Sequence, residues 1–145
     1  MRAIIQRVNN SQVTVDGRTI ADIEKGMVIL LGIGPRDDEA KSTAMAKKIA
    51  QLRIYEDEQG KMNLSLLETG GAAVVVSQFT LFADTTKGNR PSFIGAAPPE
   101  VAAPLVDHFV EELRKFNIPT KPGEFGAHML VNLQNDGPVT IWLEI

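Results

Sequence analysis

The chain has 145 residues, a mass of 15.8 kDa and a net charge of −3, from 15 basic and 18 acidic residues. Its length predicts one domain with a full core, because folding buries roughly two-thirds of the surface that the unfolded chain exposes. The acidic balance argues against wrapping duplex nucleic acid through many phosphate contacts, but leaves contact with one nucleic-acid end open. Because cysteine is absent, disulfides, thiolate metal sites and cysteine nucleophiles are excluded.

The N-terminal segment carries no recognisable targeting signal. Arg7 falls where a signal peptide needs apolar residues, and no apolar run reaches the length of a membrane-spanning helix. We therefore expect a cytoplasmic protein with no membrane partner, which also fits a chain without cysteine.

The first third of the chain is predicted to form sheet. Asp16-Gly17 lies between two alternating segments, 12–15 and 19–21, and this pattern predicts a hairpin. The continuous apolar run 27–31 is typical of a strand buried on both faces. Gly32–Pro35 ends that strand.

A helix is predicted next, because three acidic residues, 37–39, are followed by two lysines near its expected end. Its apolar face is formed by Met45, Ile49 and Leu52. Residues 53–55 then read as a short strand, followed by the polar turn 56–60 and the segment 61–64.

The second half of the chain predicts a strand at 72–82 and a helix that opens at Pro98–Glu100. Two alternating strands, 129–134 and 139–145, end the chain, and Gly137-Pro138 joins or interrupts them. The helix carries one apolar stripe, formed by Val101, Leu105, Val106, Phe109, Val110, Leu113 and Phe116.

These elements predict an α+β fold in a single domain, residues 1–145. Hairpins and long strands outnumber the helices, so we expect a curled, barrel-like, mainly antiparallel or mixed β-sheet with two principal helices packed on it. No repeat or linker divides the chain. The segment 88–99, rich in proline and glycine, is therefore interpreted as a functional loop.

No metal and no cofactor are expected. Gly32-Ile33-Gly34 follows a strand, but Asp37 stands where a dinucleotide-binding fingerprint needs its third glycine. The two histidines, His108 and His128, do not have the helical spacing of a metal-binding pair. We interpret both as structural or exposed.

Two segments together suggest a site that binds and cleaves an ester. Ser77–Leu81 places two hydroxyls and an amide directly after an apolar strand, so that polar groups emerge at a rigid strand end. Asn135–Thr140 contains a Gly-Pro step, which can adopt a cis peptide bond at little cost and can present backbone carbonyls to a ligand.

Each candidate residue also has a plainer interpretation. Ser77 and Thr80 could be nucleophiles, but no base can be assigned to them, and a hydroxyl in a strand is ordinary. The surviving hypothesis is a cluster of donors that holds an oxyanion. Lys87 and Arg90 flank Gly88-Asn89 and read either as an exposed turn or as contacts to phosphate.

The two segments resemble the two signatures of the D-aminoacyl-tRNA deacylase family. The resemblance covers essentially the whole chain, with length and motif order in agreement. Supporting matches are Gln6–Val8, Gly60–Asn63, Gly88–Phe93 and Gly123–Met129.

This resemblance implies a homodimeric proofreading enzyme. Its substrate is the 3′ end of an aminoacyl-tRNA, where it hydrolyses the ester between a D-amino acid and the terminal adenosine. Glycine mischarged on tRNA-Ala is implied as a further substrate, because glycine is achiral. The resemblance also implies that the Gly137-Pro138 step is cis and reaches into the partner's pocket, where its carbonyls bind the substrate's amino group and rigid backbone excludes an L side chain.

The family's residue roles carry over by position. Water attack assisted by the substrate's 2′-hydroxyl is favoured, with backbone N–H groups near Phe79 and Thr80 on the oxyanion. The implied catalytic residues are Ser77, Gln78, Phe79 and Thr80; chiral selection falls to Gly137, Pro138, Arg7 and Asn135; Phe125 and Met129 form the adenosine pocket. Lys87 and Arg90 are candidate phosphate contacts on the ground of charge, because an acidic protein that admits only the tRNA end needs few such contacts.

Two rival functions stay open. A generic serine or threonine esterase would act on small esters without tRNA and would depend on Thr80. A non-catalytic module would bind the tRNA end without turnover. Hydrolysis assays with matched substrates separate the three hypotheses.

Overall fold

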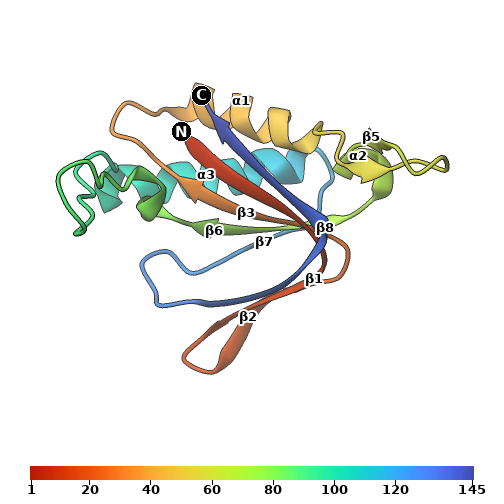
Figure 1. The fold of residues 1–145 in the computed structure, drawn as a ribbon, viewed down its shortest axis with the longest axis horizontal. Helices are drawn as coiled ribbons and strands as arrows, with labels where there is room; N and C mark the ends of the chain where they lie inside the picture. Colours follow the sequence, from red (N-terminus) through yellow and green to blue (C-terminus); the bar gives the residue numbers. More distant parts are fainter.

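The computed structural model describes the whole chain, Met1–Ile145. Six strands form one strongly curled sheet in the order β2-β1-β3-β6-β7, and β8 pairs with the free side of β1 (Figure 1). The strands of this sheet are β1 (Arg2–Val15), β2 (Arg18–Ile23), β3 (Gly26–Gly32), β6 (Ala72–Ser77), β7 (Thr120–Pro122) and β8 (Leu130–Glu144). The result is the nearly closed, barrel-like α+β fold that the sequence predicts.

Two long helices lie side by side on one face of the sheet (Figure 1). They are α1 (Glu39–Ala50) and α3 (Pro99–Lys115), joined through the Ser42 hydroxyl, which donates to the Leu105 carbonyl at 3.4 Å. Smaller elements connect them: the hairpin of β4 (Tyr55–Glu56) and β5 (Met62–Leu64), the short helix α2 (Leu66–Thr69), and the 3-10 helix η1 (Phe79–Phe82). No helix is both long and apolar enough to cross a membrane.

Local signals explain why these elements form where they do. The β1–β2 hairpin turns at Asp16 and Gly17, which both have positive φ, as the tightest hairpin turns require. Asp38 caps α1, since its side chain accepts the Lys41 N–H at 2.9 Å. Pro99 opens α3, where a missing N–H costs nothing. The predicted hairpin and both predicted helices are therefore confirmed.

The core has two parts, one on each face of β3. Met27, Ile29 and Leu31 pack under α1 and α3 within a cluster of 24 buried residues. Val28 points to the other face, where a second cluster of seven fills the inside of the curl. Because helices cover one face and the curled sheet the other, β3 is buried on both, as its apolar run predicts.

Several predicted boundaries are wrong. The strand expected at 72–82 ends at Ser77, and Phe79–Phe82 forms η1. Its partner β3 ends at Gly32, so no strand remains for a longer ladder to pair with. The strand expected at 53–55 is instead β4, Tyr55–Glu56. The elements α2 and β7 were not predicted. The last two predicted strands form one strand, β8, whose register against β1 shifts near residue 135.

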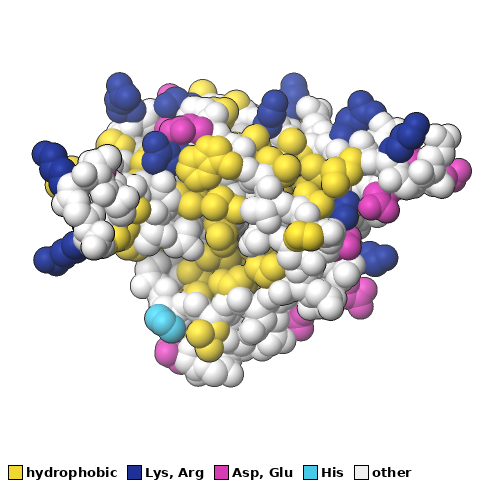
Figure 2. All heavy atoms as spheres, viewed as in Figure 1, with side chains coloured by type: hydrophobic (Ala, Val, Ile, Leu, Met, Phe, Trp, Pro, Cys, Tyr) yellow, Lys and Arg dark blue, Asp and Glu magenta, His cyan; other side chains and the backbone are white.

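A large apolar surface stays exposed on the face that carries β1 and β8. Trp142 is 49% exposed and Leu130 60% exposed, although both lie in β8. Figure 2 shows hydrophobic side chains gathered in a band across this face, rimmed by charged groups. Contiguous exposed apolar bands are unusual on monomeric proteins.

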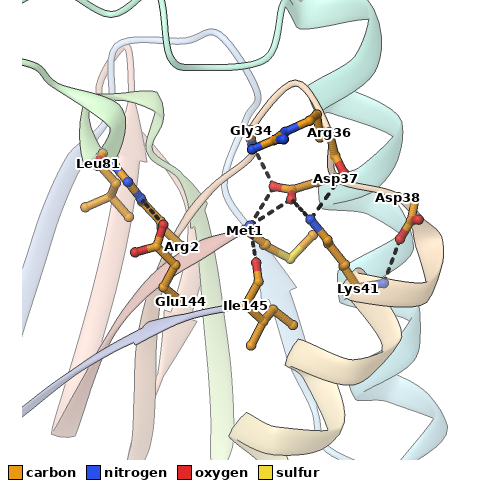
Figure 3. A network of polar contacts seen from close by, with 10 residues as sticks. All are labelled: Met1, Arg2, Gly34, Arg36, Asp37, Asp38, Lys41, Leu81, Glu144 and Ile145. Atoms are coloured by element: carbon orange, nitrogen blue, oxygen red, sulfur yellow. Dashed lines mark hydrogen bonds and ion pairs between the residues drawn. The ribbon is translucent and has the colours of Figure 1, made fainter.

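A buried ion cluster ties the ends of the sheet to the start of α1 (Figure 3). The Met1 amino group donates to Asp37 Oδ1 and to the Ile145 carbonyl, each at 2.8 Å. Asp37 also accepts the Gly34 N–H at 2.7 Å and binds Lys41 Nζ at 3.1 Å. Burial raises the pKa of Asp37, but these donors outweigh burial and hold the pKa below its usual range.

We predict that Asp37→Asn removes stability that depends on pH. A carboxyl whose pKa is lowered by folding contributes fully above its unfolded pKa, near 4, and loses that contribution as pH falls through the folded value. Urea unfolding should therefore show the variant about 1–3 kcal/mol less stable at pH 7. The gap between variant and wild type should narrow below pH ~4. A gap that is constant with pH would contradict the ionised cluster.

Candidate active site

A pocket of about 670 Å³ opens where β6 ends, between η1, the start of α3 and the segment before β8. Of its 19 lining residues 13 are hydrophobic. The polar groups come from Ser77 and Gln78, the aromatic walls from Phe79, Phe93 and Phe125, and the floor from residues that include Ala102, Val106, Met129 and Val131. An apolar pocket with a few convergent polar groups at one end suits a flat, partly apolar ligand.

The end of β6 concentrates hydrogen-bond donors at the pocket mouth. The first hydrogen bond of η1 runs from the Leu81 N–H to the Gln78 carbonyl at 3.3 Å. The N–H groups of Phe79 and Thr80 precede that bond, and leading N–H groups of a helix have no partner inside it. Phe79 is 57% exposed and meets Phe93 edge to face, with ring centroids 5.0 Å apart. This turn is built to present backbone N–H groups beside an aromatic wall.

Thr80 lacks the partners of an activated nucleophile. Its hydroxyl accepts a hydrogen bond from the Gln78 side-chain amide, and no His, Asp or Glu side chain hydrogen-bonds to it. His108 lies elsewhere, with Nδ1 3.0 Å from the Ser42 hydroxyl. No group of three or more His, Cys, Asp or Glu residues is placed to hold a metal ion. Donors, rather than a catalytic triad, are what this site offers.

Phe125 and Met129 line the pocket together with Ser77, Gln78 and Phe79. Thr80 stands exposed beside the lining rather than in it. His128 also lines the pocket, although no sequence pattern places it there. The contribution of α3 could have been suspected from its N-terminus, since the helix starts directly after the loop that holds Phe93.

The side chain of Asn135, at the start of the Gly-Pro loop, hydrogen-bonds to the residues at its end. Its side-chain oxygen accepts the Val139 N–H at 2.8 Å, and its amide nitrogen donates to the Thr140 hydroxyl at 3.1 Å. The Gly137-Pro138 peptide between these anchors is cis. The side chain of Asn135 therefore links the two ends of the loop.

Arg7 supports the same loop from below. The residue is 4% exposed. Its Nε donates to the Asp136 carbonyl at 3.1 Å, and its Nη1 donates to the Ile54 carbonyl at 2.6 Å. Nε also lies 3.1 Å from the Asp136 carboxylate, which supplies the counter-charge. The Ile54 carbonyl was not recognisable from the sequence, because nothing in residues 53–55 signals contact with residue 7.

Only glycine fits at position 137. Its φ is +124°, and a Cβ there would lie 2.9 Å from Val139 Cγ2 and 3.0 Å from Arg7 Nη2. Tyr55 lines a small cavity together with Arg7 and Asp136, and burial raises the pKa of its hydroxyl far above the usual range. The loop is thus a rigid backbone surface without side-chain bulk at its tip.

The pocket and the Gly-Pro loop lie at opposite ends of the sheet. Ser77 pairs with Leu31 at one end of β3. Asn135 pairs with Val8, and Val8 pairs with Gly26 at the other end. Five residues of strand separate the two ends, or about 16 Å. Neither Gly137 nor Pro138 lines the pocket. A single chain therefore does not bring the two signature segments together.

Known proteins resemble this chain over nearly its whole length. A sequence model of the family described as D-Tyr-tRNA(Tyr) deacylase matches residues 4–144. The D-aminoacyl-tRNA deacylase of Thermomicrobium roseum is 58% identical over 144 residues, 99% of this chain and 94% of that one. The enzyme of the same name from Thermosipho africanus is 51% identical, with 99% and 97% covered.

Solved structures share the fold. The c-Myc DNA Unwinding Element Binding Protein superimposes with a TM-score of 0.93 at 44% identity, covering 100% of this chain and 99% of that one. A probable eukaryotic D-amino acid tRNA deacylase gives 0.84 at 17% identity, covering 99% and 98%, and supports the fold alone. With full-length identity above half and a matching family model, this chain belongs to the D-Tyr-tRNA(Tyr) deacylase family.

Proposed function

We propose that this protein hydrolyses the ester that joins a D-amino acid to the terminal adenosine of tRNA. The observation that carries the proposal is 58% identity to a D-aminoacyl-tRNA deacylase across nearly the whole of both chains. The pocket supports it, because its aromatic walls suit an adenine and its donors suit an ester carbonyl. Such a substrate belongs to translation, so the proposed activity is quality control of aminoacyl-tRNA in the cytoplasm.

In the proposed reaction, water attacks the ester carbonyl carbon. The N–H groups of Phe79 and Thr80 stabilise the oxyanion, while the Gln78 amide holds the Thr80 hydroxyl in place. The bond from the carbonyl carbon to the adenosine oxygen then breaks. The proton that the attacking water loses passes through the neighbouring 2′-hydroxyl to this leaving oxygen. Ser77 lines the reacting end of the pocket, and Phe125 and Met129 hold the adenine.

The proposed chiral filter is the Gly-Pro loop of a second copy. The loop cannot reach the pocket of its own chain, and the exposed band on β1 and β8 offers a surface for a homodimer. Gly137 and Pro138 would enter the partner's pocket as rigid backbone, braced by Arg7 and Asn135. Rigid backbone excludes an L side chain but admits a D side chain on the opposite side of Cα. Glycine mischarged on tRNA-Ala would be cleaved too, because it offers no side chain to exclude.

The direct test is hydrolysis of matched D-tyrosyl-tRNA and L-tyrosyl-tRNA by purified protein, with spontaneous hydrolysis subtracted. Rapid loss of the D ester alone is the expected result. Equal loss of both esters would indicate a general esterase. Loss of neither, with tRNA still bound, would indicate a non-catalytic binding module and overturn the proposal.

We predict that Thr80→Ala retains most of the activity. Its hydroxyl has no base to activate it, so the change removes one neutral hydrogen bond, worth about 1 kcal/mol or less than about tenfold in rate. Single-turnover hydrolysis of D-tyrosyl-tRNA measures the effect. A loss of about a thousandfold or more would instead assign Thr80 as the nucleophile.

We also predict that Gly137→Ala relaxes chiral selection. The added Cβ meets Val139 and Arg7 and forces the loop to move, at a cost of about 1–3 kcal/mol in the free energy of unfolding. The ratio of D to L hydrolysis should fall by about tenfold or more.

Gly17→Ala is the matched control, since Gly17 also has positive φ but open space around it and lies in the β1–β2 turn. It should cost about 1 kcal/mol of stability and leave the D to L ratio as in wild type. Equal ratios in both variants would contradict the role of the loop.

A further inference from the structure

A second, larger cavity adjoins the pocket. It is a cleft of about 1050 Å³ between the loop that starts α1 and the loop 82–95. That second loop separates the two cavities: Phe79 and Phe93 line the pocket, whereas Phe82 and Ile94 line the cleft. A strand of ligand that leaves the pocket past Phe93 therefore meets the cleft directly.

The cleft is basic, although the chain as a whole is acidic. Its lining includes five basic side chains and three acidic ones. Two of the acids are neutralised in place: Asp37 by the Met1 amino group and Lys41, and Glu144 by Arg2 at 2.8 Å. Asp84 accepts the Thr86 N–H at 2.9 Å and keeps its charge.

Three cations in this cleft have no acidic partner: Arg36, Lys87 and Arg90 form no ion pair. Arg36 precedes α1, and the other two lie on the loop 82–95. In Figure 2, basic side chains project from the left end of the molecule, where Figure 1 places this loop. The three residues are separated in sequence but line one cavity, so their charges add.

We propose that this cleft binds the phosphates of the RNA strand that leads into the pocket, with Arg36, Lys87 and Arg90 as the contacts. The inference rests on the proposed function, because it takes the esterified adenosine in the pocket as its starting point. It adds Arg36, which lies about 50 residues from the other two and which no motif singled out. It also gives the strand a direction, over Phe93 and toward the start of α1.

Phosphate contacts of this kind bind without regard to base sequence, and their strength falls with salt as counterions are released. The cleft would thus hold the shared 3′ end of every tRNA, while the pocket examines the amino acid. An acidic protein needs a local basic site for this purpose, since its overall field repels RNA.

The test compares three substrates of increasing phosphate content: D-tyrosyl-adenosine, a D-tyrosyl-CCA trinucleotide and D-tyrosyl-tRNA. The variant is Arg36→Ala/Lys87→Ala/Arg90→Ala, and the matched control is Arg18→Ala/Lys48→Ala/Lys61→Ala. The control residues are exposed, form no ion pair and lie outside the cleft. Both variants lose the same charge, so a bulk electrostatic effect would act on both.

We expect the triple variant to raise the KM for D-tyrosyl-tRNA by about tenfold or more, with a much smaller change for D-tyrosyl-adenosine. The slope of log KM against log salt should fall by about 2, because each phosphate of a single strand that is no longer neutralised lowers it by about 0.7. The control should behave as wild type. An equal change for all three substrates, or the same change in the control, would overturn the inference.

Failure of the proposed function would look different. In that case wild-type protein would hydrolyse none of the three esters. A fluorescence titration that measures the binding of uncharged tRNA would then test the cleft alone. Weaker binding by the cleft variant than by the control supports the cleft, and equal binding overturns it.

Discussion

The register of β1 is the constraint on which the rest of the structure depends. The first half of this strand hydrogen-bonds to β3 on one side and to β8 on the other. Its second half hydrogen-bonds to β2 in place of β3, and still to β8 on the other side. Because β1 is shared by three strands, its register fixes where β3 ends and where the loop in β8 falls. The pocket and the Gly-Pro loop are consequently held at opposite ends of one rigid sheet.

Arg7, in β1, fixes the conformation of the Gly-Pro loop in β8. Its guanidinium is buried, and the Asp136 carboxylate and two backbone carbonyls compensate its charge. Loss of a hydrogen-bond partner would leave this buried charged group unsatisfied, so the arrangement is strongly specified. The contacts of Arg7 join β1, the residue before β4 and the loop in β8, three segments far apart in sequence. A loop braced in this way can act as a steric surface for another molecule.

The sequence predicted the elements whose signals are local. Asp16-Gly17 marks its hairpin by turn chemistry, and the α3 stripe marks its helix by spacing. The end of β6 could not be predicted, because it depends on where β3 stops rather than on residues 78–82. The same limit applies to the Ile54 carbonyl under Arg7 and to Arg36 in the cleft, which only the folded chain brings to their partners. The roles expected of single residues rest on the family resemblance of the sequence. The distance between Ser77–Leu81 and Asn135–Thr140 in one chain is given only by the strand register.

A hybrid dimer provides the most direct test of the claim that two chains complete one site. One chain carries Gly137→Ala, and its tagged partner carries Ala127→Trp, which fills the pocket. In the hybrid, the only open pocket faces an intact loop from the other chain. The account predicts that the purified hybrid rejects L-tyrosyl-tRNA as wild type does, although the Gly137→Ala homodimer does not. A hybrid as permissive as that homodimer would mean that each loop serves its own chain, and would contradict the account.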